Sequence, residues 1–316
     1  MDRPLNESSP GRVFVVGASN MDICAKSLKP VLDADSNIGS VSTSCGGVGR
    51  NIAVALKYLG FDVSFLTAVA DDAFGRTILE SLADSSVKAV AAPYRDDGLS
   101  TGVYSYILDS NGTLLCGIND MGINDALTPA AIDERKDVIN GADYVVFEAN
   151  LPHETIVRLG QLADDGTRLV ADCVSATKCV KLLDVLGDLF LLKANYSEAC
   201  TLAGMDDSAP KDPLAVAQRL AGKGLERGII TLGGDGAFCF EVHAFEEGGL
   251  EWYRVEPPKG AEVVNTNGCG DVLLAGFLCA LSKGCGLKDA LGFGQKAASV
   301  NARSVEAVSE ELLSLA

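Results

Sequence analysis

The segment best suited to chemistry lies near the C-terminal end of the chain, at residues 263–276 (VVNTNGCGDVLLAG). Two β-branched residues run into a turn of small residues, and an apolar helical pattern starts directly after the turn. The first turn of such a helix has unpaired N–H groups and the positive end of the helix dipole, so it can bind a phosphate. Gly268, Cys269 and Gly270 are small enough to let the backbone approach that phosphate closely.

Asp271 makes this stretch more than a phosphate-binding turn. A carboxylate beside a phosphate repels it, so its presence needs another explanation. One role would be to accept the proton of an alcohol that attacks the phosphorus. The alternative is that Asp271 only complements the helix dipole at the N-terminus of the helix. The segment alone supports both interpretations about equally.

A second glycine-rich turn, GGVGRN at residues 46–51, opens another amphipathic helix. Gly47 and Asn51 can present backbone and amide groups to a polar ligand such as a sugar. The dinucleotide-binding pattern G-x-G-x-x-G fails here, because Ile52 stands where its third glycine should be, and the P-loop pattern is absent from the chain. The sequence therefore disfavours an NAD-binding dehydrogenase.

Short apolar strands alternate with helical patterns along most of the chain. Strands are expected at residues 13–16, 63–67, 87–91, 144–147, 169–171, 189–192 and 229–232, and helices at 52–59, 74–82, 272–281 and 287–305. This alternation predicts an α/β fold with a doubly wound, mostly parallel sheet and helices on both faces. We expect one domain over residues 12–305, preceded by a flexible leader at 1–11.

Two segments interrupt the alternation, at about residues 22–45 and 99–121. The first lacks a helical period, and the second alternates around Asn111-Gly112, a strong signal for a two-residue hairpin turn. The two insertions are expected to pair into a small β-sheet. That sheet would form a lid over the carboxyl edge of the main one.

Polar residues follow the strands at that same edge, where ligands bind in open α/β sheets. They are Asn20, Asp22, Glu148, Asp172, Asn195 and Glu198. Any one of them alone could be a cap or a turn residue, but their shared position favours a site, with Glu148 on its substrate side. The chemistry expected from these residues is phosphoryl transfer to an alcohol, with Asp271 as base and Glu198 helping to place Mg²⁺.

The composition excludes several classes of function. The formal net charge of −17 repels phosphate polymers, which argues against a nucleic-acid partner or docking on an anionic membrane. No apolar run approaches the roughly 18 residues of a membrane span. Ten cysteines without a C-x-x-C pair, and only two histidines, disfavour a zinc site and indicate a reducing, cytoplasmic compartment.

On these motifs the chain resembles the ribokinase-like (PfkB) carbohydrate kinases over about residues 12–305. The turn at 46–51 is similar to the family's sugar-side signature, and residues 265–276 are similar to its anion-hole and catalytic-base signature. Two positions depart from the pattern. The family usually has Gly where Ala70 stands and Ala or Gly where Cys269 stands, so Cys269 brings an oxidisable thiol to the turn.

The resemblance implies a role for each matching residue. Asp271 would be the base, and Gly268, Cys269 and Gly270 would supply the anion-hole amides. The residues near the sugar would be Asn20, Asp22, Gly47 and Asn51. The residues on the nucleotide side would be Asn195, Thr231, Gly233, Gly236, Asn265 and Asn301, with Glu198 serving Mg²⁺. The resemblance also implies ATP as phosphate donor and a homodimer formed through the lid, and it leaves a monovalent cation such as K⁺ open.

Four segments resemble the branch of the family that acts on pseudouridine, at residues 20–23, 34–39, 118–121 and 174–179. A uracil base needs hydrogen-bond partners for two carbonyls and two N–H groups. Ser36, Asn37 and Asn119 are suited to supply them, although they can also be read as lid turn residues. The expected reaction is ATP-dependent phosphorylation of the 5′-hydroxyl of pseudouridine.

Two alternatives stay open at this point. One is another kinase of the family, acting on uridine, adenosine or a ribose-type sugar. The other is a non-catalytic nucleoside sensor that kept the fold, against which the intact Asp271 argues. The sequence also leaves open whether Lys178 contacts the substrate or only caps a helix.

Overall fold

The computed structural model describes residues 10–92, 98–162, 167–208, 210–243, 249–258, 260 and 263–316. Its strands are β1 (Arg12–Val16), β2 (Asn20–Ser27), β3 (Gly39–Gly46), β4 (Asp62–Thr67), β5 (Lys88–Ala91), β6 (Val103–Leu108), β7 (Leu114–Asp120), β8 (Tyr144–Glu148), β9 (Arg168–Asp172), β10 (Leu191–Asn195), β11 (Arg227–Thr231), β12 (Ala237–His243) and β13 (Gly249–Val255). Its α-helices are α1 (Val48–Tyr58), α2 (Ala73–Asp84), α3 (Pro129–Asp133), α4 (Lys136–Gly141), α5 (His153–Leu162), α6 (Ala176–Cys179), α7 (Tyr196–Ala203), α8 (Pro213–Ala221), α9 (Cys269–Ser282) and α10 (Leu287–Asn301). Short 3₁₀ helices are η1 (Gly122–Ala126), η2 (Val180–Asp188), η3 (Gly233–Asp235) and η4 (Glu310–Leu315).

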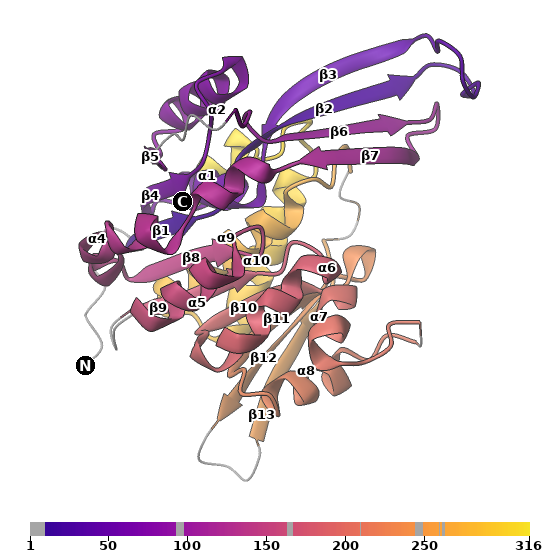
Figure 1. The fold of residues 1–316 in the computed structure, drawn as a ribbon. Helices are drawn as coiled ribbons and strands as arrows, with labels where there is room; N and C mark the ends of the chain where they lie inside the picture. Colours follow the sequence, from indigo (N-terminus) through magenta and orange to yellow (C-terminus); the bar gives the residue numbers. More distant parts are fainter. Residues whose placement is uncertain are drawn as a thin grey trace.

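The main sheet has the strand order β13-β12-β11-β10-β9-β8-β1-β4-β5 (Figure 1). Neighbouring strands from β11 to β5 are parallel, and only β12 and β13 join antiparallel. The structure confirms the predicted doubly wound, mostly parallel sheet. The antiparallel strands β12 and β13 at one edge were not expected. They come after β11, the last strand that the alternating sequence pattern identified.

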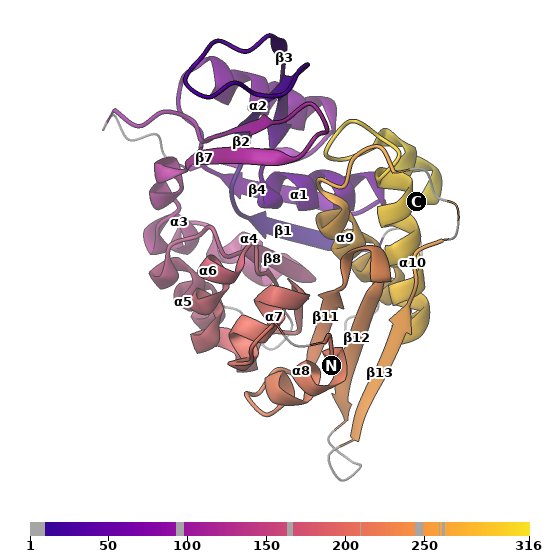
Figure 2. The ribbon, with the colours of Figure 1, turned by 90° about the vertical axis from the view of Figure 1, so that its right-hand side faces the viewer.

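Helices cover both faces of this sheet (Figure 2). Val13 and Val15 of β1 face the core under α1, α9 and α10, whereas Phe14 and Val16 face the core under α5, α7 and α8. Successive side chains of a strand point to opposite faces, so a sheet covered twice needs continuous apolar runs such as VFVV. The two cores pack against opposite faces of the sheet, and the candidate site lies along the edge formed by the carboxyl ends of its strands.

The lid is a separate sheet of order β3-β2-β6-β7, built from the two insertions that the sequence predicted (Figure 1). β2 pairs in parallel with β6, and the outer strands pair antiparallel. Only three residues separate β1 from β2. Because of this short connection, the base of the lid is fixed at the carboxyl end of β1.

Two predicted boundaries were wrong. β10 covers Leu191–Asn195, whereas the strand was expected at 189–192, so Lys193 lies inside a buried strand. A lysine is tolerated there because its ammonium is paired with a carboxylate on the next strand. α10 ends at Asn301 rather than at residue 305, and the chain continues through a turn into η4, whose Leu312 is fully buried in the core with α1 and α9.

Most of the expected leader lies outside the described residues. Its last two residues are placed: Pro10 is buried, and the carbonyl of Gly11 accepts a hydrogen bond from Asp62 N at 3.0 Å. Among the described residues, no helix is long and apolar enough to cross a membrane. All ten cysteines are free thiols.

Candidate active site

Asp271 lies in the first turn of α9, as the sequence predicted. The residue before the helix, Gly268, has a φ of 73°, and a Cβ there would lie 2.0 Å from the carbonyl oxygen of Ala307. Only glycine fits such a left-handed, crowded position. The turn therefore presents the N-terminus of a 14-residue helix at the carboxyl edge of the sheet, which is suited to bind a phosphate.

The carboxyl group of Asp271 is almost completely buried, and Asn51 Nδ2 donates a hydrogen bond to its Oδ2 at 3.0 Å. Burial and the nearby charge of Asp172 raise the pKa of Asp271 to about 7, although Lys193 and the Asn51 hydrogen bond act in the opposite direction. A carboxyl group that titrates near neutrality is well matched to take up a proton from an alcohol.

The glycine turn before α1 brings Asn51, one of the residues expected near the sugar, next to Asp271. Gly47 has a φ of 101°, and a Cβ there would lie 2.4 Å from the carbonyl oxygen of Ala18, so α1 starts in close contact with the β1–β2 connection. Asn20 Nδ2 donates to Asp22 Oδ1 at 2.6 Å at the base of the lid. Burial raises the pKa of Asp22, while the Asn20 hydrogen bond lowers it.

The face of the lid that carries Asp22 also carries two further polar residues. Asp22 is in register with Tyr104, and Tyr104 with Asn119, so the three side chains point to the same side of the sheet. The rings of Tyr104 and Tyr106 are stacked, with centroids 5.1 Å apart. The sequence analysis did not assign these tyrosines, although their alternation in β6 placed both on one face.

Ser36 and Asn37, which we expected to contact a base, lie in the loop at the far end of β2 and β3. Asp22 pairs with Ser44 at the base, while Ser27 pairs with Gly39 at the other end. Five residues of strand separate these levels, which is about 16 Å. The amide of Asn37 bonds to the backbone of its own loop, and both residues are exposed. Within one protomer the two strands therefore separate this loop from the base of the lid, and the contact of Ser36 and Asn37 with a base stays a prediction.

Three ionisable residues form a row across the ends of three neighbouring strands. Glu148 of β8 is in register with Asp172 of β9, and Asp172 with Lys193 of β10. Lys193 Nζ lies 2.9 Å from Asp172 Oδ2. The sequence analysis placed Asp172 at this edge but gave Lys193 no role. The alternation of Leu191 and Lys193 in a buried strand was the signal that could have identified it.

Glu148 was expected to bind substrate, and its role in substrate binding stays a prediction. Its side chain is fully buried, and its two oxygens accept hydrogen bonds from the backbone of Ala18 and Asn150, both at 2.6 Å. Burial raises the pKa of Glu148 to about 7. The residue therefore connects the end of β8 to the β1–β2 connection beneath the lid.

Asn195 and Glu198 form a capping box at the start of α7. Asn195 Oδ1 accepts from Glu198 N at 2.9 Å, and the Glu198 carboxylate accepts from Asn195 N and Nδ2, both at 2.7 Å. Among the described residues, no group of three or more His, Cys, Asp or Glu side chains could hold a metal ion. Mg²⁺ bound with a nucleotide needs only one or two carboxylates besides the phosphates, so the expected role of Glu198 stays a prediction.

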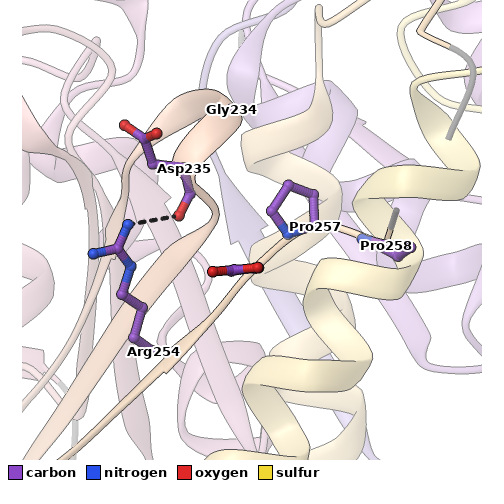
Figure 3. A pocket seen from close by; sticks show the side chains of 6 residues that line it. Gly234, Asp235, Arg254, Pro257 and Pro258 are labelled. Carbon is purple, nitrogen blue, oxygen red and sulfur yellow. Dashed lines mark hydrogen bonds between the residues drawn. The ribbon is translucent and has the colours of Figure 1, made fainter. Parts of the chain in front are cut away.

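The predicted nucleotide loop forms the turn between β11 and β12. Thr231 ends β11, Gly233 is the first residue of the short helix η3, and Gly236 follows its last residue. Beside it lies a cavity of about 310 Å³ lined by Gly234, Asp235, Arg254, Glu256, Pro257 and Pro258 (Figure 3). Arg254 Nη2 donates to the carbonyl oxygen of Asp235 at 3.2 Å and points along the cavity wall (Figure 3).

Asn301 and Asn265 hydrogen-bond to backbone groups of the segment that follows α10. Asn301 is fully buried: its amide donates to Ala307 O at 3.0 Å, and its Oδ1 accepts from Ser309 N at 2.8 Å. The polar atoms of Asn301 are thus used within the chain, and its expected place on the nucleotide side stays a prediction. Asn265 Nδ2 similarly donates to Val305 O at 3.1 Å.

Two residues left open by the sequence are now placed. Burial raises the pKa of Cys269, which disfavours the thiolate that reacts with oxidants. Lys178 Nζ donates to Asn150 Oδ1 at 2.5 Å, so it connects α6 to the end of β8 rather than capping a helix.

Comparison with known proteins agrees with this geometry. Residues 11–312 match the family described as pfkB family carbohydrate kinase. The chain belongs to the pfkB family of carbohydrate kinases. It is 33% identical to the pseudouridine kinase of Escherichia coli strain K12, over 96% of this chain and 94% of that protein.

Solved structures show the same fold. A carbohydrate kinase from Agrobacterium tumefaciens has a TM-score of 0.80 and 28% identity, over 96% of each chain. The ribokinase of Giardia lamblia has a TM-score of 0.82 at 18% identity, over 97% of this chain and 98% of that one. The pfkB protein described here is thus a kinase with the ribokinase-like fold, and kinases of this family generally use ATP and Mg²⁺.

Proposed function

We propose that this pfkB kinase transfers the γ-phosphate of ATP to the 5′-hydroxyl of pseudouridine. The observation that carries the proposal is the buried carboxylate of Asp271, held by Asn51 at the N-terminus of α9. The similarity to a pseudouridine kinase, at 33% identity over nearly the whole chain, supports the choice of substrate.

In the proposed reaction, the 5′-hydroxyl gives its proton to Asp271 while its oxygen attacks the γ-phosphorus, and ADP leaves. The amides of Gly268, Cys269 and Gly270 stabilise the negative charge on the transferred group. Glu198 would hold Mg²⁺, which neutralises phosphate charge when bound. The lid excludes water, which would otherwise compete with the hydroxyl.

The lid face suggests how a nucleoside would be distinguished from a free sugar. Asp22 is suited to accept hydrogen bonds from the ribose hydroxyls. Tyr104 and Asn119 lie further across the same face, where a base attached to the ribose would reach them. Asn119 can donate and accept, which matches the carbonyl and N–H groups of a uracil ring.

We also propose that two copies associate through the other face of the lid. Val41, Ile107 and Ile118 point away from Asp22, and their exposed fractions are 71%, 46% and 69%. Apolar side chains that exposed, on neighbouring strands of one sheet, are typical of an interface. A second copy would cover them with the same surface, as in a two-fold dimer.

The deciding experiment is kcat/KM with ATP and Mg²⁺ for pseudouridine, uridine, cytidine and ribose. We expect pseudouridine to be preferred by orders of magnitude, because an unpaired polar group in the site costs about 1–3 kcal/mol for each wrong substrate. A preference for ribose or uridine would leave the kinase chemistry intact and reject the substrate. No turnover on any of them, with a nucleoside still stabilising the fold, would favour a sensor.

A further inference from the structure

We propose that Lys193 and Asp172 are positioning residues for this phosphoryl transfer: their ion pair places a fixed positive charge beneath the anion hole and controls the ionisation of Asp271. The inference deepens the proposed function and rests on it. It assigns a role to a lysine and an aspartate that the proposed reaction does not otherwise use.

The pair is built into the sheet. Asp172 and Lys193 are direct neighbours in register on β9 and β10, and their side chains share the face that α1 and α9 cover. Their charged atoms are 2.9 Å apart, and the side chains are only 1% and 10% exposed. Val174 N donates to the other oxygen of Asp172 at 2.8 Å, which fixes the carboxylate.

The ammonium of Lys193 lies close to the backbone of the proposed anion hole. A Cβ on Gly270 would lie 2.8 Å from Lys193 Nζ, so the ammonium is in close contact with the backbone of the first turn of α9. A charge buried at that distance is weakly screened by solvent. It therefore adds to the positive potential of the helix N-terminus where a phosphate would bind.

Ionisable groups face Asp271 from several elements. The carboxylates of Asp172 on β9 and Glu148 on β8 raise the pKa of Asp271, and the ammonium of Lys193 on β10 lowers it. On α1, Asn51 donates to Asp271. Glu198 of α7 acts on Lys193. Lys193 thus faces a set of carboxylates, and their charges raise its pKa even though burial lowers it.

A purely structural role does not explain this arrangement. Burying an ion pair costs desolvation, and apolar side chains of similar size often stabilise a fold as well or better. Leu191 and Val170 occupy the equivalent face one residue pair earlier in the same strands and pack in the apolar core. On this face the strands change from the apolar pair Val170 and Leu191 to the charged pair Asp172 and Lys193, whose charges act on Asp271.

The test measures the titration of Asp271 directly by ¹³C NMR of protein labelled at the aspartate carboxyl carbon. The Asp271 signal is identified by its loss in Asp271→Asn. We expect Lys193→Met to raise the pH at which Asp271 titrates and Asp172→Asn to lower it, each by about one pH unit or more. The control is Lys88→Met with Asp62→Asn, an exposed ion pair at 2.7 Å on the amino side of β4 and β5, which should leave the titration unchanged.

Each single variant leaves one buried charge unpaired and can fail to fold, so the double variant Lys193→Met/Asp172→Asn is measured as well. It should fold, and by calorimetry it should bind ATP at least about tenfold more weakly than wild type while its affinity for AMP changes little. The reason is that AMP has no γ-phosphate to reach the anion hole.

An ATP-selective loss in the double variant, together with opposite shifts in the single variants that fold, supports the inference. Shifts in the same direction, an unchanged titration, or equal losses for ATP and AMP would overturn it. None of these readouts needs turnover. A wild-type protein that phosphorylates none of the four test substrates would count against the proposed function and not against this ion pair.

Discussion

The side-chain amide of Asn51 donates to the carboxylate of Asp271 at 3.0 Å, although 220 residues separate the two in the chain. Arg50 fixes this amide from the other side: its Nη1 donates to Asn51 Oδ1 at 3.3 Å, and its Nη2 donates to Ser81 Oγ at 2.8 Å. An amide with its oxygen occupied can turn only its NH₂ group toward Asp271. The sugar-side turn thereby keeps the proposed base in place.

Replacing Asp271 should nearly abolish turnover. We expect Asp271→Asn and Asp271→Ala to lower kcat by about 10²–10⁴-fold, because the attacking hydroxyl loses its proton acceptor. Binding of the nucleoside, measured by calorimetry, should survive in both variants. A variant with near-wild-type kcat would show that Asp271 is not the base.

Removing the Asn51 amide should move the pH profile. The hydrogen bond stabilises the ionised form of Asp271, so its loss raises the pKa of that group. A bond worth about 1 kcal/mol corresponds to about 0.7 pH unit. In Asn51→Ala, the acid limb of kcat/KM should therefore shift to higher pH by about that amount. Asn140→Ala, on α4, serves as a control and should leave the limb in place. A limb that stays fixed in Asn51→Ala would contradict the assignment.

Asp271 should make the fold less stable at neutral pH. Its pKa is about 7 in the folded state against 3.8 for the ordinary group, so between these values the folded protein binds more protons than the unfolded chain. Stability from this group is therefore lost as the pH rises from about 4 to about 7. Asp271→Asn removes that dependence. We expect the variant to exceed wild type in free energy of unfolding by roughly 1–3 kcal/mol at pH 8, with the difference shrinking toward pH 5. Urea titrations at both pH values measure it, and a difference independent of pH would refute the prediction.

Gly268→Ala should damage both the fold and the anion hole. A left-handed backbone costs a non-glycine residue about 1–2 kcal/mol, and here the added methyl group also collides with Ala307 O. Gly112→Ala is a matched control, because Gly112 has a φ of 88° with no atom within 4 Å of the added Cβ. Thermal unfolding should show a clearly larger loss for Gly268→Ala, accompanied by a loss of kcat. Equal losses would mean that the contact with Ala307 is unimportant.

A charge on the outer face of the lid should separate the proposed dimer. Val41→Asp combined with Ile118→Asp places two carboxylates where apolar side chains would meet. We expect light scattering after gel filtration to show a monomer for this variant and a dimer for wild type. Val138→Asp changes an equally apolar side chain, 47% exposed, on α4 and should remain dimeric. A monomeric wild type would reject the proposal.

Local patterns were enough to predict much of this protein. Buried runs such as VFVV, each followed by polar residues, indicated the parallel sheet and its ligand-binding edge. The alternation around Asn111-Gly112 predicted a lid hairpin, and the hairpin formed. The predicted two-residue turn was wrong, because Asp109 N donates to Thr113 O and the turn between them spans residues 110–112. The glycine turn before α9 and Asp271 could be recognised in the sequence because the signal is local. Glycine, small residues and an acid at the start of a helix all lie within about six residues.

Only the tertiary structure decided which polar residues face the site. Glu148 and Asn301 look like accessible ligands in the sequence, but both are fully buried and hydrogen-bonded to backbone groups. Ser36 and Asn37 carry suitable groups, but the length of two strands carries them away from Asp271. In the sequence Lys193 looks like a residue that merely follows a strand. In the structure it is in register with Asp172 and forms an ion pair with it near the first turn of α9. Chemical type and local spacing are properties of a short segment, whereas burial, register and the distance to Asp271 depend on residues far away in the chain.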